Sequence, residues 1–331
     1  MTTTAPASPA ISPALPLASP DQRWPIELLW EGEPPPADVV VRGGQLPAEL
    51  RARFAARLAI PLRPDRPTIA VNFVSTLDGV VALDRAGATG GREISGGFEP
   101  DRFVMGLLRA TADAVLVGAG TVRASRTHAW TPGQVHPPSA SSYAGWRRTL
   151  GLAAAVPTTV MVSASGNLDP GHLGLADLGP PIIVVTTTAG ARRLRDLPRR
   201  DHVEIVAVTD AARVPTEALI DLLHERGFEL VLSEGGPTLF GELLAARAVD
   251  ELFLTVAPQV AGQSERAERL GLVEGVGFPP ELAPWARLRS VMRSQDHLFL
   301  RYVFKRTDWM DVGAFANPSV PIDEMASWWS L

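Results

Sequence analysis

Short apolar runs alternate with segments of helical periodicity along most of the chain from residue 67 onward. The runs are rich in Val and Ile, which is typical of buried strands, and the segments between several of them place apolar residues every three to four positions, which indicates amphipathic helices. Strands that alternate with helices predict an α/β fold with a mostly parallel central sheet and helices on both faces. The predicted strands span 68–74, 113–118, 158–163, 181–187, 203–208 and 230–232, and the predicted helices span 98–112, 191–197, 215–227 and 237–246.

The alternation stops near the C-terminus. Residues 250–262 and 286–306 predict further strands, and no helical segment separates the last two. An antiparallel C-terminal hairpin at the edge of the sheet fits this pattern. The apolar alternation in "ELFLTVAPQV" and "HLFLRYVF" could also serve an edge-to-edge dimer.

The N-terminal part of the chain differs in composition from the alternating region. Residues 1–22 are rich in Pro, Ala and Ser and lack the basic start and continuous apolar segment of a signal peptide, so they predict a disordered tail. Residues 23–66 predict an extension packed on the main domain, with a possible helix over 47–59.

The main domain is predicted to cover residues 67–306. Within it, residues 131–150 are rich in Pro and Ser and predict an irregular loop or insertion near the site. Residues 307–331 hold three tryptophans among acidic and small residues. This C-terminal tail is expected either to fold back onto the domain or to bind a partner.

Composition and charge exclude several classes of function. The 331 residues carry a formal net charge of −5, so no overall basic surface indicates a nucleic acid or an acidic membrane as partner. No apolar run approaches the roughly 18 to 20 residues that cross a bilayer. The chain has no cysteine, which excludes disulfides, thiol nucleophiles and thiolate metal sites. Its six histidines form no H-x-x-x-H pair, so no metal site is predicted. Without a predicted membrane span or signal peptide, we expect a soluble, cytoplasmic protein.

The stretch "LVLSEGGPTLFGELL" joins a predicted strand to a predicted helix through two glycines. The free N–H groups and the dipole of a helix N-terminus attract phosphate. Gly235 and Gly236 would let a ligand approach the backbone closely. Pro237 suits the first helical position, and Thr238 can offer a hydroxyl to a phosphate oxygen. A tight strand-to-helix turn without a ligand is the alternative.

A second joint, "VLVGAGTVRAS", also runs from a strand through glycines to a helix start. Both joints would lie at the carboxyl ends of parallel strands, where ligands bind in open α/β sheets. Two helix N-termini there suit the pyrophosphate of a dinucleotide, and a glycine turn chosen for packing is the alternative. A third strand ends in "STLDG", where Asp-Gly signals a turn and Thr76 or Asp78 would stand at the mouth of the same crevice.

The blocks "STLDG", "REISGG", "LLRATADAVLVGAGTVRA" and "LVLSEGGPTLFGELLAARAVDELFLTVAPQVAG" together resemble the reductase domain of riboflavin biosynthesis, the RibD C-terminal family. The resemblance covers about residues 66–305. It implies a dihydrofolate-reductase-like fold, NADPH as cofactor and a homodimer. It also implies that the substrate is a small heterocycle, a ribosylamino-pyrimidine phosphate that is reduced to its ribitylamino form.

The resemblance assigns candidate roles by position. Relatives often have a cis bond at the Gly-Gly turn, so a cis peptide is expected between Gly235 and Gly236. For Arg109 the alternative is a helix-end arginine that caps carbonyls, and for Glu234 a strand-end carboxylate in a structural hydrogen bond. The substrate-binding candidates are Asp78, Ser95, Arg109 and Glu234. The cofactor-binding candidates are Gly118, Gly120, Thr121, Gly235, Gly236, Pro237, Thr238 and Leu239, with Ser163 and Ser165 for the adenosine 2′-phosphate.

The sequence departs from the family pattern after the "GAG" loop. Family members usually continue "TV-x-x-D-D-P-x-L", whereas this chain reads "TVRASRTHAW", with Ser125 at the position of the first aspartate. Thr76 stands where serine is usual. These changes leave reduction of a dihydropterin or another heterocycle as an alternative.

No catalytic acid is assigned from the sequence. Hydride would pass from NADPH to a C=N group while Asp78 or Glu234 orients that group and water carries the proton. The zinc deaminase often joined to such reductases needs a cysteine pair, so deaminase activity is not expected of a chain without cysteine. A nucleotide-binding regulatory protein that has lost turnover is the non-enzymatic alternative, and the aromatic tail motivates it.

Overall fold

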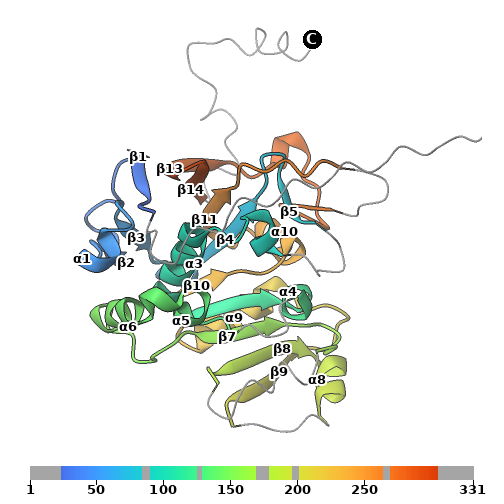
Figure 1. Cartoon of the computed structure of the whole chain (residues 1–331). Coiled ribbons are helices and arrows are strands. Elements are labelled where there is room, and N and C mark those ends of the chain that lie inside the picture. The colour runs from blue at the N-terminus through green and yellow to red at the C-terminus, as the bar shows by residue number, and fades with distance from the viewer. Residues whose placement is uncertain are drawn as a thin grey trace, which may run out of the picture.

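The computed structural model describes residues 24–83, 90–124, 129–168, 179–195, 201–263 and 269–304. This part of the chain forms a ten-stranded sheet with helices on both sides (Figure 1). Seven strands run parallel, and three antiparallel strands complete one edge, so the predicted parallel sheet and C-terminal hairpin are confirmed. In sheet order the strands are β1 (Glu27–Glu31), β13 (Ala286–Ser294), β14 (His297–Phe304), β11 (Val249–Val256), β4 (Thr68–Ser75), β10 (Leu230–Ser233), β6 (Ala114–Gly118), β7 (Thr158–Val162), β8 (Ile182–Thr187) and β9 (Val203–Thr209).

The longer helices bury the two faces of the sheet in separate clusters. Alternate residues of a strand point to opposite faces. In β4, Ala70 therefore joins a cluster with one pair of helices, whereas Ile69 and Val71 join a cluster with the other pair. The first pair is α3 (Glu99–Thr111) and α6 (Ala140–Thr149), and the second is α9 (Thr216–Glu225) and α10 (Pro237–Ala245).

Several shorter elements connect these layers. Two small antiparallel sheets pair β2 (Val41–Gly44) with β3 (Leu58–Pro61), and β5 (Val80–Ala82) with β12 (Leu270–Gly271). The short helices are α1 (Ala48–Arg51), α2 (Gly91–Ile94), α4 (Ala119–Ala124), α5 (Pro132–Val135), η1 (Pro137–Ser139), α8 (Thr188–Leu194) and η2 (Pro280–Leu282).

Helix α3 forms where its sequence pattern predicts it. Pro100 stands in the first turn, where its missing N–H costs no hydrogen bond, and Glu99 and Asp101 place carboxylates near the positive end of the helix dipole. The helix ends after Thr111 because Ala112 is extended, with a ψ of 153°. Since α3 leads into the amino end of β6, its own N-terminus lies at the carboxyl edge of the sheet.

The N-terminal extension contains strands where a helix was predicted. Of the predicted helix 47–59, only Ala48–Arg51 is helical, and Leu58 begins β3, which pairs with β2. Tertiary pairing overrides helix propensity here, because Leu58 and Ile60 are each 1% exposed in a cluster shared with α3. The pairing needs glycine at position 43, where φ is 99° and a Cβ would lie 2.0 Å from the Leu58 carbonyl oxygen.

Buried ion pairs fasten this extension to the sheet. Asp250, in β11, accepts hydrogen bonds from Arg63 at 2.7 Å and from Arg66 at 2.8 and 2.9 Å. The same carboxylate accepts the Ile69 backbone N–H at 2.9 Å. The Asp250 carboxylate therefore orients both the end of the extension and strand β4.

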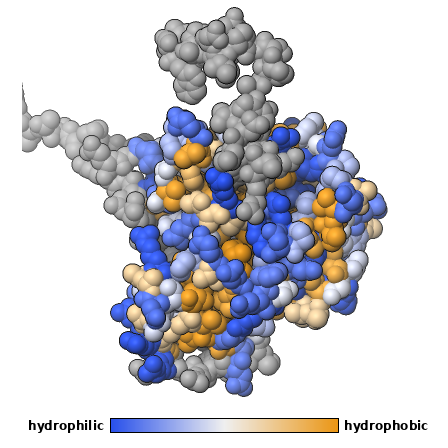
Figure 2. Space-filling model, turned by 180° about the vertical axis from the view of Figure 1, so that it is seen from behind, coloured by the Kyte–Doolittle hydropathy of each residue, from blue (hydrophilic) through white to orange (hydrophobic). Residues whose placement is uncertain are grey.

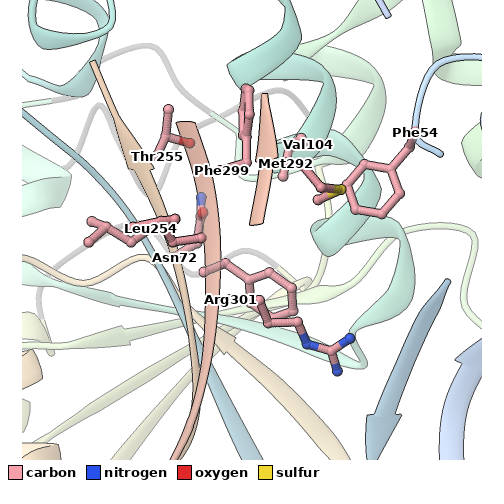
Figure 3. Close-up of a pocket in the computed structure, with 10 residues that line it drawn as sticks. Phe54, Asn72, Val104, Leu254, Thr255, Met292, Phe299 and Arg301 are labelled. Carbon is pink, nitrogen blue, oxygen red and sulfur yellow. The ribbon is translucent and has the colours of Figure 1, made fainter. Parts of the chain in front are cut away.

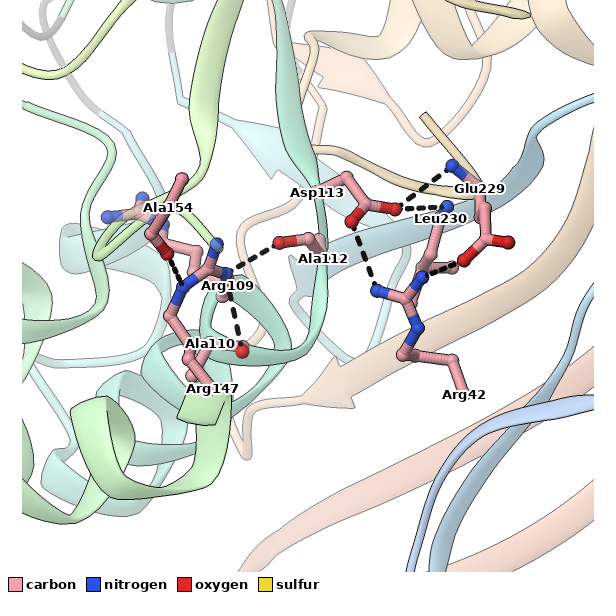
Figure 4. A network of polar contacts seen from close by, with 9 residues as sticks. All are labelled: Arg42, Arg109, Ala110, Ala112, Asp113, Arg147, Ala154, Glu229 and Leu230. Carbon is pink, nitrogen blue, oxygen red and sulfur yellow. Dashed lines mark hydrogen bonds and ion pairs between the residues drawn. The ribbon is translucent and has the colours of Figure 1, made fainter. Parts of the chain in front are cut away.

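A second fastening lies beside the amino end of β6 (Figure 4). Arg42 donates to Asp113 at 3.1 Å and also pairs with Glu229. Asp113 in turn accepts the backbone N–H groups of Glu229 and Leu230, at 3.0 and 2.8 Å. The extension thus contacts the residues that start two central strands.

Residues 131–150 are not the irregular loop that was predicted. They form α5, η1 and α6, which pack on α3. Tyr143 donates its hydroxyl to the Phe103 carbonyl at 2.8 Å, and its ring fills the space beside Gly106, where a Cβ would approach to 2.7 Å. Arg147 donates to the Ala112 carbonyl at 2.7 Å, as Figure 4 shows. The prolines and serines stand at the starts of the helical segments, and the buried side chains of Tyr143 and Trp146 pack α6 into the core.

Both predicted tails, 1–22 and 307–331, lie outside the described residues. Within the part of the chain that is described, no helix has the length and apolar character needed to cross a membrane.

Replacing Asp250 with Ala should lower the free energy of unfolding by about 3 kcal/mol, because breaking a buried ion pair leaves uncompensated charge. Urea denaturation measures the loss. Glu204→Ala is the matched control, because it breaks an ion pair with Arg226 whose side chains are 50% and 34% exposed. That control should cost less than about 1 kcal/mol. Equal losses in the two variants would contradict a fastening role for Asp250.

Candidate functional site

The two glycine joints meet at the carboxyl edge of the sheet. Strands β10 and β6 are parallel neighbours, with Ser233 opposite Leu116. The pairing continues one residue further, because the Glu234 N–H donates to the Leu116 carbonyl at 2.9 Å. Helices α10 and α4 then begin side by side. A Cβ on Gly236 would lie 3.4 Å from the Thr121 hydroxyl, so the joints are in contact.

The joint between β10 and α10 is built without a cis peptide. The expected cis bond between Gly235 and Gly236 is wrong, because the described residues contain no cis peptide and Gly236 is extended, with φ −66° and ψ 173°. This conformation already directs Pro237 into the first turn of α10.

The glycines of the two joints differ in what requires them. A Cβ on Gly235 would lie 2.5 Å from Leu239, so packing of that buried side chain accounts for this glycine. A Cβ on Gly120 would meet nothing within 4 Å. Gly120 and Thr238 are exposed, and Thr121 is half-buried between them. The open part of the site is therefore formed by the starts of α4 and α10.

A buried ion pair between Arg109 of α3 and Glu234, the residue after β10, lies next to the Gly-Gly turn in the chain. Arg109 donates from Nε to Glu234 at 2.8 Å and from Nη2 to its second oxygen at 2.5 Å. The side chains are 1% and 8% exposed. The remaining Nη1 donates to the Thr131 carbonyl at 3.3 Å. Arg109 donates to Glu234 and to the Thr131 carbonyl rather than to the end of its own helix, and it holds the carboxylate of the residue just before the Gly-Gly turn.

Asp78 closes a turn at the end of β4. It accepts the Thr76 hydroxyl at 2.6 Å and the backbone N–H groups of Ala261 and Gly262 at 3.0 and 2.6 Å. These donors, the Ala261 N–H first among them, lower the pKa of Asp78 to about 2. Asp78 is therefore ionised at neutral pH and ties the turn before β5 to the chain after β11.

Ser95 and Asp101 form a second polar cluster at the same edge. Ser95 follows α2, is 4% exposed, and its carbonyl faces His297 Nε2 at 3.3 Å. The Asp101 carboxyl is 5% exposed, and the nearby side chains of Thr255 and Ser95 lower its pKa. Burial, reinforced by the charge of Glu234, raises the pKa of Asp101 to about 6. No sequence pattern pointed to this residue, because an acidic residue in a first helical turn usually serves the helix dipole.

The predicted phosphate-binding serines follow β7, the neighbour of β6 on the side away from β10. Ser163 is 3% exposed, and its hydroxyl has no hydrogen-bond partner among the described residues. Ser165 accepts the Asn167 N–H at 3.3 Å and lies in the turn. A buried hydroxyl without a protein partner is expected to meet one in a ligand or water.

The cavity in Figure 3 is not part of this site. Its volume is about 10 Å³, which is room for one water molecule at most. It lies between α3 and the antiparallel strands, lined by Asn72, Val104, Thr255 and Met292 among others. Among the described residues no group of three or more His, Asp or Glu side chains could hold a metal ion.

Comparison with known proteins identifies a family and its fold. The model of the RibD C-terminal domain matches residues 67–293. A 2,5-diamino-6-ribosylamino-4(3H)-pyrimidinone 5′-phosphate reductase of Methanothermobacter thermautotrophicus is 32% identical over 243 residues, which cover 72% of this chain and 99% of the relative. A reductase of the same name from Archaeoglobus fulgidus is 26% identical over 197 residues, which cover 60% of this chain and 83% of the relative.

Two solved structures share the fold. A pyrimidine reductase-like protein of Corynebacterium diphtheriae aligns with a TM-score of 0.54 and 23% identity, over 72% of this chain and 92% of that chain. A deaminase/reductase of Thermotoga maritima, named for diaminohydroxyphosphoribosylaminopyrimidine deaminase and 5-amino-6-(5-phosphoribosylamino)uracil reductase activities, aligns with a TM-score of 0.52 and 24% identity, over 73% of this chain. This chain spans only 57% of that bifunctional protein.

The low pKa of Asp78 predicts an acid-sensitive turn. A carboxylate whose pKa is lowered by folding contributes stability above its unfolded value of 3.8, and this contribution is lost as the pH falls toward 2. Asp78→Asn should therefore be less stable than the parent at pH 6, and the difference should shrink on acidification. Urea denaturation at a series of pH values measures it. A difference that stays constant from pH 6 to pH 3 would contradict this account.

Proposed function

The chain belongs to the RibD C-terminal domain family, and we propose that it is an NADPH-dependent reductase of a ribosylamino-pyrimidine phosphate in riboflavin biosynthesis. The relatives named above support this substrate class, the first of them matching over 99% of its length. The observation that carries the proposal is the contact between two glycine-lined helix starts at the carboxyl edge of a parallel sheet. Such an edge is where nucleotides bind in open α/β folds.

The described residues fit an NADPH molecule at this edge. Gly120 and Thr121 on one joint, with Gly236 and Thr238 on the other, would hold the diphosphate through backbone N–H groups and hydroxyls. The unpartnered Ser163 hydroxyl, one strand further along the sheet, would meet the adenosine 2′-phosphate. When bound, NADPH supplies a hydride from its reduced nicotinamide.

The substrate would lie on the Glu234 side of the joints. Ser95 and Glu234 are the side chains that we assign to the substrate, because they stand at the same edge of the sheet as the cofactor joints. Arg109 acts through Glu234, since its donors are engaged within the protein. Asp78 is assigned to the turn, because its hydrogen bonds join Thr76 to Ala261 and Gly262.

Hydride transfer to the substrate requires that the substrate is held in position, that its charge is stabilised and that water is excluded. A C=N group of the substrate accepts hydride more readily when its nitrogen is protonated or hydrogen-bonded. The Glu234 carboxylate, fixed by Arg109, can stabilise the positive charge of the protonated C=N group before the hydride is added. The segment "SRTH" at residues 125–128, where the chain departs from the family pattern, lies outside the described residues.

Gly120 offers a sharp test of the cofactor site. Gly120→Val should fold as the parent does, because a side chain there meets open space, and should bind NADPH at least tenfold more weakly. Fluorescence titration of NADPH measures affinity, and loss of NADPH absorbance with the pyrimidinone phosphate measures turnover. Gly145→Val, on the remote helix α6, is the matched glycine control and should bind as the parent does. Equal NADPH affinity in the parent and Gly120→Val would place the cofactor elsewhere.

We further propose that a second copy of the chain covers one face of the antiparallel strands. One row across five strands holds Phe73, Leu254, Leu300, Val291 and Trp30. Phe73 at its inner end packs on Phe240 of α10, whereas Trp30 at its outer end is 47% exposed. Figure 2 shows hydrophobic surface on the side of the molecule where β1 and β13 lie. A flat apolar sheet face of this kind is suited to pack against its own copy about a two-fold axis.

A charge placed on this face should separate the two copies. Leu298, next to this row on β14, is 37% exposed, and so is Ile205 on β9 at the opposite edge of the sheet. Leu298→Glu should therefore give a monomer, whereas Ile205→Glu should remain a dimer. Sedimentation velocity at micromolar concentration distinguishes the two. A monomeric parent, or a Leu298→Glu variant that stays dimeric, would contradict the proposed interface.

A further inference from the structure

A cavity of about 270 Å³ lies between α5, α6 and the residues that precede β7. It is large enough for a small organic molecule, although most ligand pockets are somewhat larger, at roughly 300–1,000 Å³. Gln134 and Ala155 on its rim are exposed, whereas Tyr143 and Arg147 on its floor are buried. The proposed reduction does not use this α6 cavity.

One face of α6 forms a side of the cavity. Ala140, Tyr143, Ala144 and Arg147 follow the spacing at which residues of a helix share a face. The two alanines are apolar, and the Tyr143 hydroxyl already donates to the Phe103 carbonyl at 2.8 Å. An occupant therefore meets apolar side chains along α6, and the charge among the lining residues is that of the Arg147 guanidinium.

Arg147 is a buried cation whose hydrogen bonds all go to backbone carbonyls. Its side chain is 2% exposed; Nε donates to Ala154 at 3.0 Å, and Nη1 donates to Ala112 at 2.7 Å. Burial lowers the pKa of Arg147 to about 10, so it stays charged at neutral pH. Its remaining nitrogen, Nη2, donates to no residue of the part of the chain that the structure describes.

The nearest carboxylate is already taken. Asp113 acts on Arg147 from a distance, but it bonds Arg42 and two backbone N–H groups, and the charge of Arg42 acts in the opposite direction (Figure 4). The carbonyls at the end of α3 offset part of the Arg147 charge, because they form the negative end of the helix dipole. A buried charge with no ionic partner remains unfavourable, and an anion in the adjoining cavity would relieve it.

We propose that the α6 cavity binds a small organic carboxylate with an apolar body, and that this carboxylate accepts hydrogen bonds from Nη2 of Arg147. Thr131, which also lines the cavity, offers a hydroxyl as a second donor. The apolar body packs on Ala140 and Ala144. Charge complementarity selects an anion, and the apolar wall selects a carboxylate with a hydrophobic body over a small inorganic ion.

The cavity contacts the candidate site through Arg109. The Thr131 carbonyl accepts a hydrogen bond from Arg109 Nη1 at 3.3 Å, and Arg147 Nη1 donates to the Arg109 carbonyl at 3.4 Å. Arg109 in turn holds Glu234. A ligand that fixes Thr131 and Arg147 therefore also restricts Arg109, and its binding alters the affinity for the substrate. This link to the substrate rests on the proposed function, whereas the binding site itself does not.

Calorimetric titration of the full chain with sodium benzoate tests the site. Benzoate should bind saturably, with one ion per chain, and benzamide, which has the same shape without the charge, should bind more weakly by about tenfold or more. Arg147→Gln should lose benzoate affinity by a similar factor. Arg148→Gln, which removes an exposed arginine from the same helix, is the matched control and should bind as the parent does.

A second variant keeps the test valid if Arg147→Gln fails to fold, since Arg147 also bonds the end of α3. Ala144→Leu places a larger apolar side chain in the cavity and leaves every hydrogen bond of Arg147 in place. This variant should unfold at the same temperature as the parent and should no longer bind benzoate. Equal benzoate affinity in the parent and Ala144→Leu, or equal affinity of the parent for benzoate and benzamide, would overturn the proposed site.

The link to the substrate has its own readout. Saturating benzoate should change the dissociation constant of the pyrimidinone phosphate in the parent and leave it unchanged in Ala144→Leu. The pyrimidinone phosphate should change the benzoate dissociation constant by the same factor, because coupling between two sites is reciprocal. A parent that binds both ligands independently would overturn the link. A parent that binds benzoate but neither binds NADPH nor reduces the pyrimidinone phosphate would overturn the proposed function and support the cavity site.

Discussion

The buried pair of Arg109 and Glu234 is the interaction on which the rest of the site depends. Taking two charges out of water costs several kcal/mol per ion, which two parallel hydrogen bonds repay only when the geometry is good. Here both bonds are short, and they join the last turn of α3 to the first residue after β10. The pair therefore fixes the position of Glu234, the residue from which the Gly-Gly turn begins. Removing either partner would leave a charge buried at the centre of the sheet.

The sequence predicted the elements whose signals are local. Apolar runs and helical periodicity placed the seven parallel strands and α3, and strand-glycine-helix patterns located both joints. It failed where a distant partner decides the outcome. Residues 58–61 form a strand because β2 lies beside them, and Tyr143 and Trp146 make α6 a core helix because α3 offers them space. The expected cis bond came from resemblance alone, and the extended Gly236 makes it unnecessary.

The sequence predicted where the candidate site lies, but it did not predict most of the side-chain contacts within it. Gly120 and Thr238 lie open at the edge where the pattern put them, whereas Gly235 serves the packing of Leu239. Asp78 and Arg109 are where they were expected, yet their hydrogen bonds go to the protein. Asp101 could not be found in advance, because the Thr255 side chain that lowers its pKa lies more than 150 residues later in the chain. Sequence patterns report chemistry near a backbone position and do not report which side chains will pair.

The edge strand β1 has a consequence for how the protein comes to be made. Glu27 of β1 bonds Arg293 of β13 across a separation of 266 residues, so the first described strand can pair only after one of the last described strands has been made. During synthesis the apolar side chains of Leu28, Leu29 and Trp30 stay exposed until β13 is available. Exposed apolar segments of this kind bind chaperones or other nascent chains. Completion of the ten-stranded sheet thus follows the synthesis of β13 and β14.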